Sequence, residues 1–160
     1  MERLWAPWRM QYINTPETSG CIFCDKPRLD DRDAMIVRRR EFGFLMLNAF
    51  PYNNGHLLAA PYQHTAEISE LPSEARLQLM DLVDEAITLL RKMGNPDGFN
   101  VGINLGRVAG AGILDHIHLH IVPRWNGDTN FMPVLADTKV LPEALEEVWG
   151  KLHALAEASE

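Results

Sequence analysis

The sequence lacks the features that would place it in a membrane, in an oxidising compartment or on nucleic acid. No apolar run approaches the length that crosses a bilayer, and residues 1–5 do not begin a secretory signal. Two cysteines among 160 residues are too few for a disulfide framework. The formal net charge of −7 gives no general attraction to nucleic acid or to anionic lipid. We therefore expect a cytoplasmic protein with no nucleic-acid partner and no membrane partner.

Several common motifs of nucleotide and metal chemistry are also absent. The glycine-rich stretch at 106–112 leads into a predicted strand, whereas the dinucleotide-binding fingerprint opens a helix. There is no Gly-Lys-Ser/Thr loop and no His-Glu-x-x-His pair. A phosphate ligand would therefore have to be met by imidazoles, by single arginines, or by the backbone amides of the glycine stretch, which can form an anion nest.

Histidine is the residue type that this chain concentrates. Only six histidines occur, and three of them alternate with aliphatic residues between positions 115 and 123. That alternation has the period of a β-strand, so one face would carry His116, His118 and His120 while the aliphatic residues face a core. We expect Pro123 to end this strand, because proline has no N–H to donate.

The rest of the pattern predicts an antiparallel α+β layer in one domain that spans residues 1–160. Apolar residues recur at helical spacing from 72 to 94, and a second amphipathic helix is expected over 142–158. Strands and helices do not alternate strictly, which favours an antiparallel sheet with its helices on one face. The charged residues 25–33 are expected to form a surface loop. The other predicted strands cover residues 35–39, 42–48, 56–60 and 99–105.

The N-terminal segment, residues 1–20, is rich in aromatic residues, including Trp5 and Trp8. Two tryptophans so close to a terminus indicate that the segment is tied down. Packing on the chain's own core and packing across a subunit interface explain them equally well.

Cys21 and Cys24 have the spacing of half a zinc site or of a redox pair. His64 and one histidine of the strand could complete a Cys₂His₂ set. From the residues alone, a zinc site and two free thiols are equally supported.

The remaining histidines suit chemistry at phosphorus. A neutral imidazole is a good nucleophile toward a phosphorus ester, and its ordinary pKa leaves much of it neutral at pH 7. A neighbouring imidazole can protonate the leaving group, and glycine amides can stabilise charge on the phosphoryl oxygens.

Residues 116–122 resemble the signature of the histidine triad family of nucleotidyl hydrolases and transferases. The segment from Asn48 to His56 resembles that family's upstream block, and Cys-x-x-Cys with residues 61–64 resembles its zinc-binding branch. Residues 4–9, 98–106 and 123–132 are similar to the prokaryotic branch related to diadenosine tetraphosphate phosphorylases.

The resemblance implies a histidine triad fold, with a five-stranded sheet extended across a homodimer. His118 would be the nucleophile, and His120 and His56 would lie near the phosphate and the leaving group. Asn48 would meet the ribose. A structural zinc ion would be held by Cys21, Cys24, His64 and His116, and the phosphate would be met by Asn104, Gly110, Ala111 and Gly112 together with His118 and His120.

The resemblance also implies the reaction, which is cleavage of adenosine di- or polyphosphates at the α-phosphorus through a nucleotidyl-histidine. The most specific prediction is that the substrate is diadenosine tetraphosphate, cleaved by phosphate or by water. Many members carry Ala-Gly-Gln-Ser/Thr before the triad, whereas this chain has Ala-Gly-Ala-Gly at 109–112 and a loop one residue longer. The alternatives are a nucleoside phosphoramidase, an adenylylsulfate-cleaving enzyme, and a catalytically silent nucleotide-binding protein.

Overall fold

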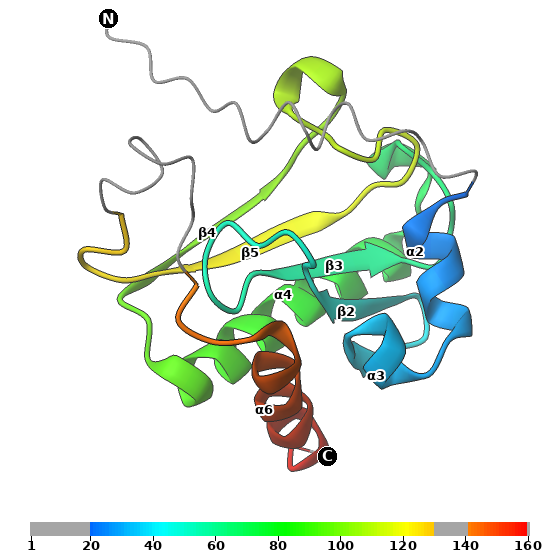
Figure 1. The fold of residues 1–160 in the computed structure, drawn as a ribbon. Coiled ribbons are helices and arrows are strands. Elements are labelled where there is room, and N and C mark those ends of the chain that lie inside the picture. Colours follow the sequence, from blue (N-terminus) through cyan, green and yellow to red (C-terminus); the bar gives the residue numbers. More distant parts are fainter. Residues whose placement is uncertain (1–19, 130–140, 160) are drawn as a thin grey trace, which may run out of the picture.

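The computed structural model describes residues 20–129 and 141–159, which form an antiparallel five-stranded sheet with helices packed against it (Figure 1). The strands lie in the order β1-β2-β3-β5-β4. The predicted fold class, α+β with a five-stranded antiparallel sheet, is therefore confirmed. The predicted packing of the N-terminal tryptophans lies outside the described residues. The strands are β1 (Ile36–Arg39), β2 (Gly43–Leu47), β3 (Leu57–Pro61), β4 (Gly98–Ile103) and β5 (Leu119–Arg124).

Two helices cover one face of the sheet and form the main core with it. α4 (Ser73–Gly94) packs on β2, β3 and β5, and α6 (Leu145–Glu157) packs on α4 and β1. Leu79, Leu82 and Leu90 of α4 are buried, as the helical spacing predicted. No helix within the described ranges is both long and apolar enough to cross a membrane.

The opposite face of the sheet carries a smaller core and the histidines. α2 (Ile22–Asp25), a short helix that was not predicted, places the ring of Phe23 6.5 Å from that of Phe44 in β2. Ile117, Leu119 and Ile121 point into the core under α4 and α6. The histidines between them therefore face the side on which α2 lies.

The histidine segment is less regular than the predicted strand over 115–123. β5 begins only at Leu119, so His116 and His118 precede it. The neighbouring strand β3 ends at Pro61, which has no N–H for a further ladder bond. The Pro61 carbonyl instead accepts a hydrogen bond from Nε2 of His116 at 2.9 Å. A side-chain contact thus replaces the ladder there, while the alternation of faces is kept.

The prediction that Pro123 ends the strand is wrong. β5 continues to Arg124, and Pro123 pairs with Phe99 of β4. Its carbonyl accepts a hydrogen bond from Nδ2 of Asn53 at 3.0 Å, on the side away from β4. The missing N–H would point to that same side, so the ladder between β4 and β5 loses no bond.

The charged segment 25–33, predicted to be a surface loop, is partly helical. Asp30 caps one short helix, because its carboxylate accepts the N–H of Arg32 at 3.0 Å. The short helices here and elsewhere are η1 (Lys26–Arg28), α3 (Asp31–Ala34), η2 (Ile68–Glu70) and η3 (Arg107–Ala109).

The C-terminal helix is shorter than the predicted range of 142–158, since α6 runs from Leu145 to Glu157. Glu143 lies just before it and pairs with Lys151, while Asn54 donates a hydrogen bond to the same carboxylate at 3.4 Å. Glu143 therefore ties the start of α6 to the loop before β3 instead of forming the first turn.

Candidate active site and metal centre

Three of the predicted histidines come together on one face of the sheet. The ring centroids of His118 and His120 are 4.9 Å apart, and those of His56 and His120 are 5.2 Å apart. His56, immediately before β3, is fully buried, His118 is buried, and His120 is half-buried. The structure thus groups the residues predicted to carry the chemistry.

The hydrogen bonds around His56 fix which of its nitrogens carries the proton. Nδ1 accepts the backbone N–H of Tyr52 at 3.1 Å, so this nitrogen has no hydrogen of its own. The side-chain amide of Asn48 lies 3.2 Å from the same Nδ1. Burial, and secondarily the two neighbouring histidines, lower the pKa of His56 to about 3. At pH 7 the ring is therefore neutral and carries its proton on Nε2.

The proton of His120 follows from that of His56. Nε2 of His56 lies 3.0 Å from Nδ1 of His120, and because Nε2 donates, Nδ1 of His120 accepts. A neutral His120 then carries its proton on Nε2. The ring of Tyr52 stacks on His120 at a centroid distance of 5.7 Å and an interplanar angle of 13°. Tyr52 and His56 together orient His120 as an N–H donor.

His118 has the opposite tautomer. Its Nδ1 lies 2.9 Å from the carbonyl oxygen of His116, and a carbonyl can only accept, so the proton is on Nδ1 and Nε2 keeps its lone pair. The ring packs 4.6 Å from that of Phe23. Burial lowers the pKa of His118, against the opposing effect of the carbonyl. The ring is therefore neutral at pH 7, which is the nucleophilic form of imidazole.

His118 and His120 therefore present a hydrogen-bond acceptor and a hydrogen-bond donor on the same face of the sheet. The Nε2 lone pair of His118 can attack an electrophilic phosphorus, and the Nε2–H of His120 can hydrogen-bond the oxygen that is displaced. Both nitrogens of His56 are engaged within the protein, so this residue lies behind His120.

Two cysteines and two further histidines converge beside this site. The ligand atoms of Cys21, Cys24, His64 and His116 all lie within 4.8 Å of one another. Nδ1 of His116 lies 3.3 Å from Sγ of Cys21 and 3.2 Å from Nδ1 of His64, which is 3.3 Å from Sγ of Cys24. Tetrahedral zinc, with bonds of about 2.3 Å to sulfur and about 2.0 Å to nitrogen, would set these atoms roughly 3.3–3.8 Å apart. The donor set and these spacings fit a closed Cys₂His₂ centre.

His116 links this centre to His118. Its Nε2–H donates to the Pro61 carbonyl, which leaves Nδ1 for a metal, and its own carbonyl holds Nδ1 of His118. Burial lowers the pKa of His116, which favours the neutral form that metals bind. Burial, with the nearby Cys21, raises the pKa of Cys24, an effect that a divalent cation between the two sulfurs would offset.

The residues predicted to bind the nucleotide lie at the ends of β2 and β4. Asn48 follows β2, and its amide oxygen accepts the N–H of Phe50 at 3.0 Å while its amide nitrogen faces the buried histidine. Asn104 and residues 110–112 lie in the loop after β4 and are partly exposed, apart from Gly112, which is exposed. Ile113 packs against the small core that contains Phe23, which anchors the end of this loop on the histidine face.

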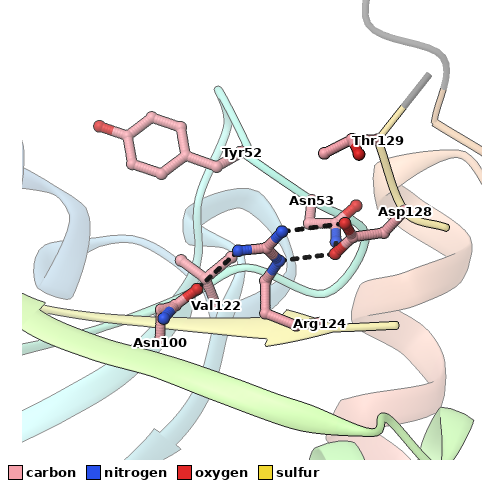
Figure 2. Close-up of a pocket in the computed structure, with 7 residues that line it drawn as sticks. All are labelled: Tyr52, Asn53, Asn100, Val122, Arg124, Asp128 and Thr129. Atoms are coloured by element: carbon pink, nitrogen blue, oxygen red, sulfur yellow. Dashed lines mark hydrogen bonds and ion pairs between the residues drawn. The ribbon is translucent and has the colours of Figure 1, made fainter. Parts of the chain in front are cut away.

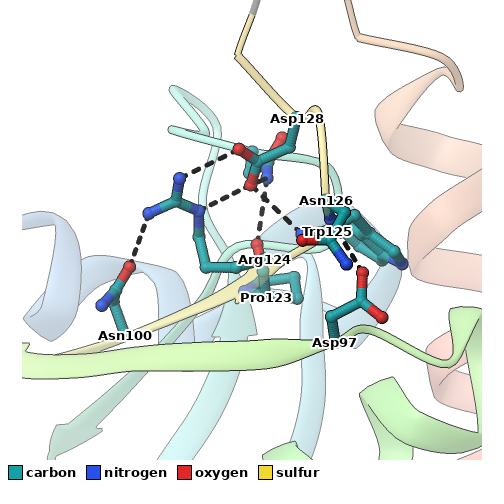
Figure 3. Close-up of polar contacts among 8 residues, drawn as sticks. Asp97, Asn100, Pro123, Arg124, Trp125, Asn126 and Asp128 are labelled. Atoms are coloured by element: carbon teal, nitrogen blue, oxygen red, sulfur yellow. Dashed lines mark hydrogen bonds and ion pairs between the residues drawn. The ribbon is translucent and has the colours of Figure 1, made fainter.

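A pocket of about 290 Å³ lies toward the end of β5, and its residues were not predicted to be functional (Figure 2). Nε and Nη2 of Arg124 bond to Asp128 at 2.6 and 2.9 Å, and Nη1 bonds to Asn100 at 2.7 Å. Asp128 also accepts the N–H of Trp125 at 3.2 Å and the amide of Asn53 at 2.8 Å (Figure 3). The sequence does contain a sign of this pocket: the two-residue period of the histidine strand, extended to position 124, places Arg124 on the same face as His120.

Known proteins resemble this chain in both sequence and fold. The HIT domain matches residues 31–127. The AP-4-A phosphorylase of Mycobacterium tuberculosis is 36% identical over 156 residues, which cover 92% of this chain and 80% of that protein. The adenosine 5′-monophosphoramidase of Schizosaccharomyces pombe is 32% identical over 107 residues, or 67% of this chain and 76% of that protein.

A solved structure, that of a zinc-bound histidine triad family protein from Mycobacterium smegmatis, matches with a TM-score of 0.67 and 26% identity. The match covers 88% of this chain and 98% of that one. The chain therefore belongs to the histidine triad (HIT) family and is one of its nucleotide-hydrolysing or nucleotide-transferring enzymes.

Proposed function

We propose that this enzyme cleaves adenosine di- or polyphosphates at the α-phosphorus through a nucleotidyl intermediate on His118. Diadenosine tetraphosphate, split by phosphate or by water, is the best candidate substrate. The observation that carries the proposal is the hydrogen-bond pattern of the two rings, from which His118 is assigned a lone pair on Nε2 and His120 an N–H on Nε2. The similarity to an AP-4-A phosphorylase supports the substrate class.

The reaction has two steps. Nε2 of His118 attacks the α-phosphorus, a P–N bond forms, and the bond from phosphorus to the bridging oxygen breaks. The Nε2–H of His120 hydrogen-bonds that oxygen, and the rest of the substrate leaves as an anion, which is adenosine triphosphate when the substrate is diadenosine tetraphosphate. The carbonyl of His116 stabilises the positive charge that develops on the His118 ring through its bond to Nδ1. Water or phosphate then attacks phosphorus, the P–N bond breaks, and the acceptor's proton passes to solvent.

The other predicted residues support this step from either side of the phosphorus. Asn48 is proposed to meet the ribose, and His56 to hold His120 in its donating tautomer. Phosphate oxygens would be met by Asn104 and by the backbone amides of Gly110, Ala111 and Gly112. Because this loop has no glutamine or hydroxyl side chain at 110–112, its contribution is limited to main-chain donors.

Cleavage of a nucleoside phosphoramidate by the same histidines is the second candidate. The relative from Schizosaccharomyces pombe, which is named a monophosphoramidase, supports it. Adenylylsulfate cleavage and silent nucleotide binding are the remaining alternatives, and the complete set of histidines argues against the silent form.

Zinc is proposed to be structural, held by Cys21, Cys24, His64 and His116 with no open position. Bound there, it would supply folding energy and fix the backbone that carries His118. Cysteines that share such a site, and form no disulfide within the described chain, suit the reducing cytoplasm, where we place the protein.

A homodimer that continues the sheet across β4 is also proposed. β4 is an edge strand whose middle is exposed, with 44% of Val101 accessible. Val101 pairs with Ile121, two positions from the pair of Phe99 with Pro123. Because Pro123 directs its carbonyl away from β4, the N–H of Phe99 and that of Val101 face the free edge. An edge of this kind can pair with a second copy.

The experiment that tests the proposed function replaces the nucleophile. His118→Ala should abolish cleavage of diadenosine tetraphosphate, because loss of a nucleophile typically lowers the rate by several orders of magnitude. The melting temperature and the affinity for the nucleotide should stay unchanged. His153→Ala is the matched control, because His153 stacks on Trp149 of α6 at a centroid distance of 4.8 Å, away from the site. A His118→Ala protein with a near-normal rate would contradict the proposal.

A further inference from the structure

The pocket toward the end of β5 continues the row of histidines. Strand alternation places His120, Val122 and Arg124 on one face, and four residues of strand span about 13 Å. Tyr52 belongs to both places, because its ring stacks on His120 and also lines the pocket (Figure 2). One extended ligand can therefore contact the histidines and the pocket together.

The pocket lies on the side of the leaving group. His118 holds the nucleotide that is transferred, and His120 bonds the oxygen of the group that departs. Continuing in the same direction along the strand leads to Val122 and then to the pocket. The part of the substrate beyond the scissile bond is therefore the part that points toward Arg124.

The stretch between His120 and the pocket has room for phosphates. Gly102 of β4 pairs with His120, and Gly98 pairs with Arg124. A Cβ built on either glycine would meet no atom within 4 Å. The sheet is therefore open beside His120, where a chain of phosphates would run.

Arg124 offers its flat face rather than its N–H edge. All three of its nitrogens are hydrogen-bonded, to Asp128 and to Asn100, yet 44% of the side chain is exposed. The carboxylate of Asp128 balances its charge, so a phosphate entering here would compete with that carboxylate. Three of its five N–H groups are thus in use, and the exposed guanidinium plane can stack on a planar ring.

We propose that this pocket binds the distal nucleoside of a dinucleoside polyphosphate, with its base stacked on the guanidinium plane of Arg124 beside Tyr52. Val122 supplies an apolar wall, and Thr129 and the amide nitrogen of Asn100 supply polar contacts at the rim. The inference rests on the proposed function and deepens it, because it makes Arg124 the residue that selects dinucleotides over mononucleoside polyphosphates.

The test measures equilibrium binding in zinc-loaded, full-length protein with His118→Ala, so that no ligand is consumed during calorimetry. The ligands are diadenosine tetraphosphate and adenosine 5′-tetraphosphate, which lacks the second nucleoside. We expect the dinucleotide to bind about tenfold more tightly, the usual effect of stacking one base.

Arg124→Lys keeps the charge and a partner for Asp128 but has no plane to stack on, so the ratio of the two affinities should fall to about one. The affinity for adenosine 5′-tetraphosphate should change less than about twofold. Asn100→Phe, which fills the pocket from the edge strand, should have the same effect. Arg40→Lys is the matched control, because Arg40 pairs with Glu85 at 2.9 Å on another part of the molecule and should leave the ratio unchanged.

Equal affinities for the two ligands before Arg124 is replaced would overturn the inference. Arg124→Lys that weakens both ligands equally would do the same, since it would make Arg124 a support for the whole site. Cleavage is measured separately with His118 intact: failure to cleave either nucleotide would refute the proposed function, while the binding ratio alone decides the pocket.

Discussion

Lowering the pH should destabilise this protein through His56, which the fold keeps buried and neutral. Its pKa is about 3 in the folded protein, because of burial and its two histidine neighbours, against an ordinary value of 6.5. Above pH 6.5 the residue is uncharged in both the folded and the unfolded chain, so its contribution is constant. Below pH 6.5 the unfolded chain binds a proton there and the folded chain does not, so stability falls progressively until about pH 3.

The size of the effect follows from that window. Each pH unit within it costs about 1.4 kcal/mol, so a change from pH 6.5 to about pH 5 removes roughly 2 kcal/mol through His56 alone. The assay is urea unfolding of the zinc-loaded protein between about pH 7 and pH 5, compared with His56→Phe, whose ring cannot titrate. Groups remote from His56 contribute equally in both proteins and cancel in the comparison. If the two stability curves run parallel, His56 is not held neutral and the proton assignment of His120 fails with it.

Three further predictions concern the metal, the donor histidine and the assembly. Cys21→Ser should lower zinc content and melting temperature together, because metal binding energy is folding energy here; unchanged melting without zinc would contradict a structural role. His120→Ala should reduce the cleavage rate by about 10² to 10⁴, less for leaving groups that need no proton, and steady-state rates with several leaving groups would check both parts. Val101→Pro removes an N–H only from the free edge of β4, so it should shift the molecular mass in light scattering from that of a dimer to that of a monomer. The circular dichroism spectrum should stay unchanged. A variant that remains dimeric, or a wild-type protein that is monomeric, would exclude this interface.

The sheet was predictable from the sequence because its period is local. Alternation around His118 and the apolar spacing in the helix over 72–94 each depend on neighbours a few positions away, and both are confirmed. The exact ends of β5 were not predictable. They depend on Pro61, which ends the adjacent strand, and on Asn53, whose amide meets the Pro123 carbonyl. Both partners lie far away in the sequence.

Within the site, too, some residue roles could be predicted from the sequence and others depend on contacts between distant residues. The resemblance to the histidine triad family supplied the four proposed metal ligands, and the structure places their ligand atoms within 4.8 Å of one another. The position of His56 behind His120 depends on a backbone N–H of Tyr52, which no pattern of side chains encodes. The pocket at Arg124 was missed because it needs the register of β4 against β5, which brings Asn100 opposite Val122.

The proposed role of His118 as the nucleophile can be tested by trapping the covalent adduct on its ring. Enzyme turning over diadenosine tetraphosphate would be quenched, digested and examined by mass spectrometry. We expect an acid-labile adenylate on the peptide that contains His118, absent in His118→Ala and retained in His153→Ala. Turnover with no adduct at any time, or with the adenylate on another residue, would contradict it.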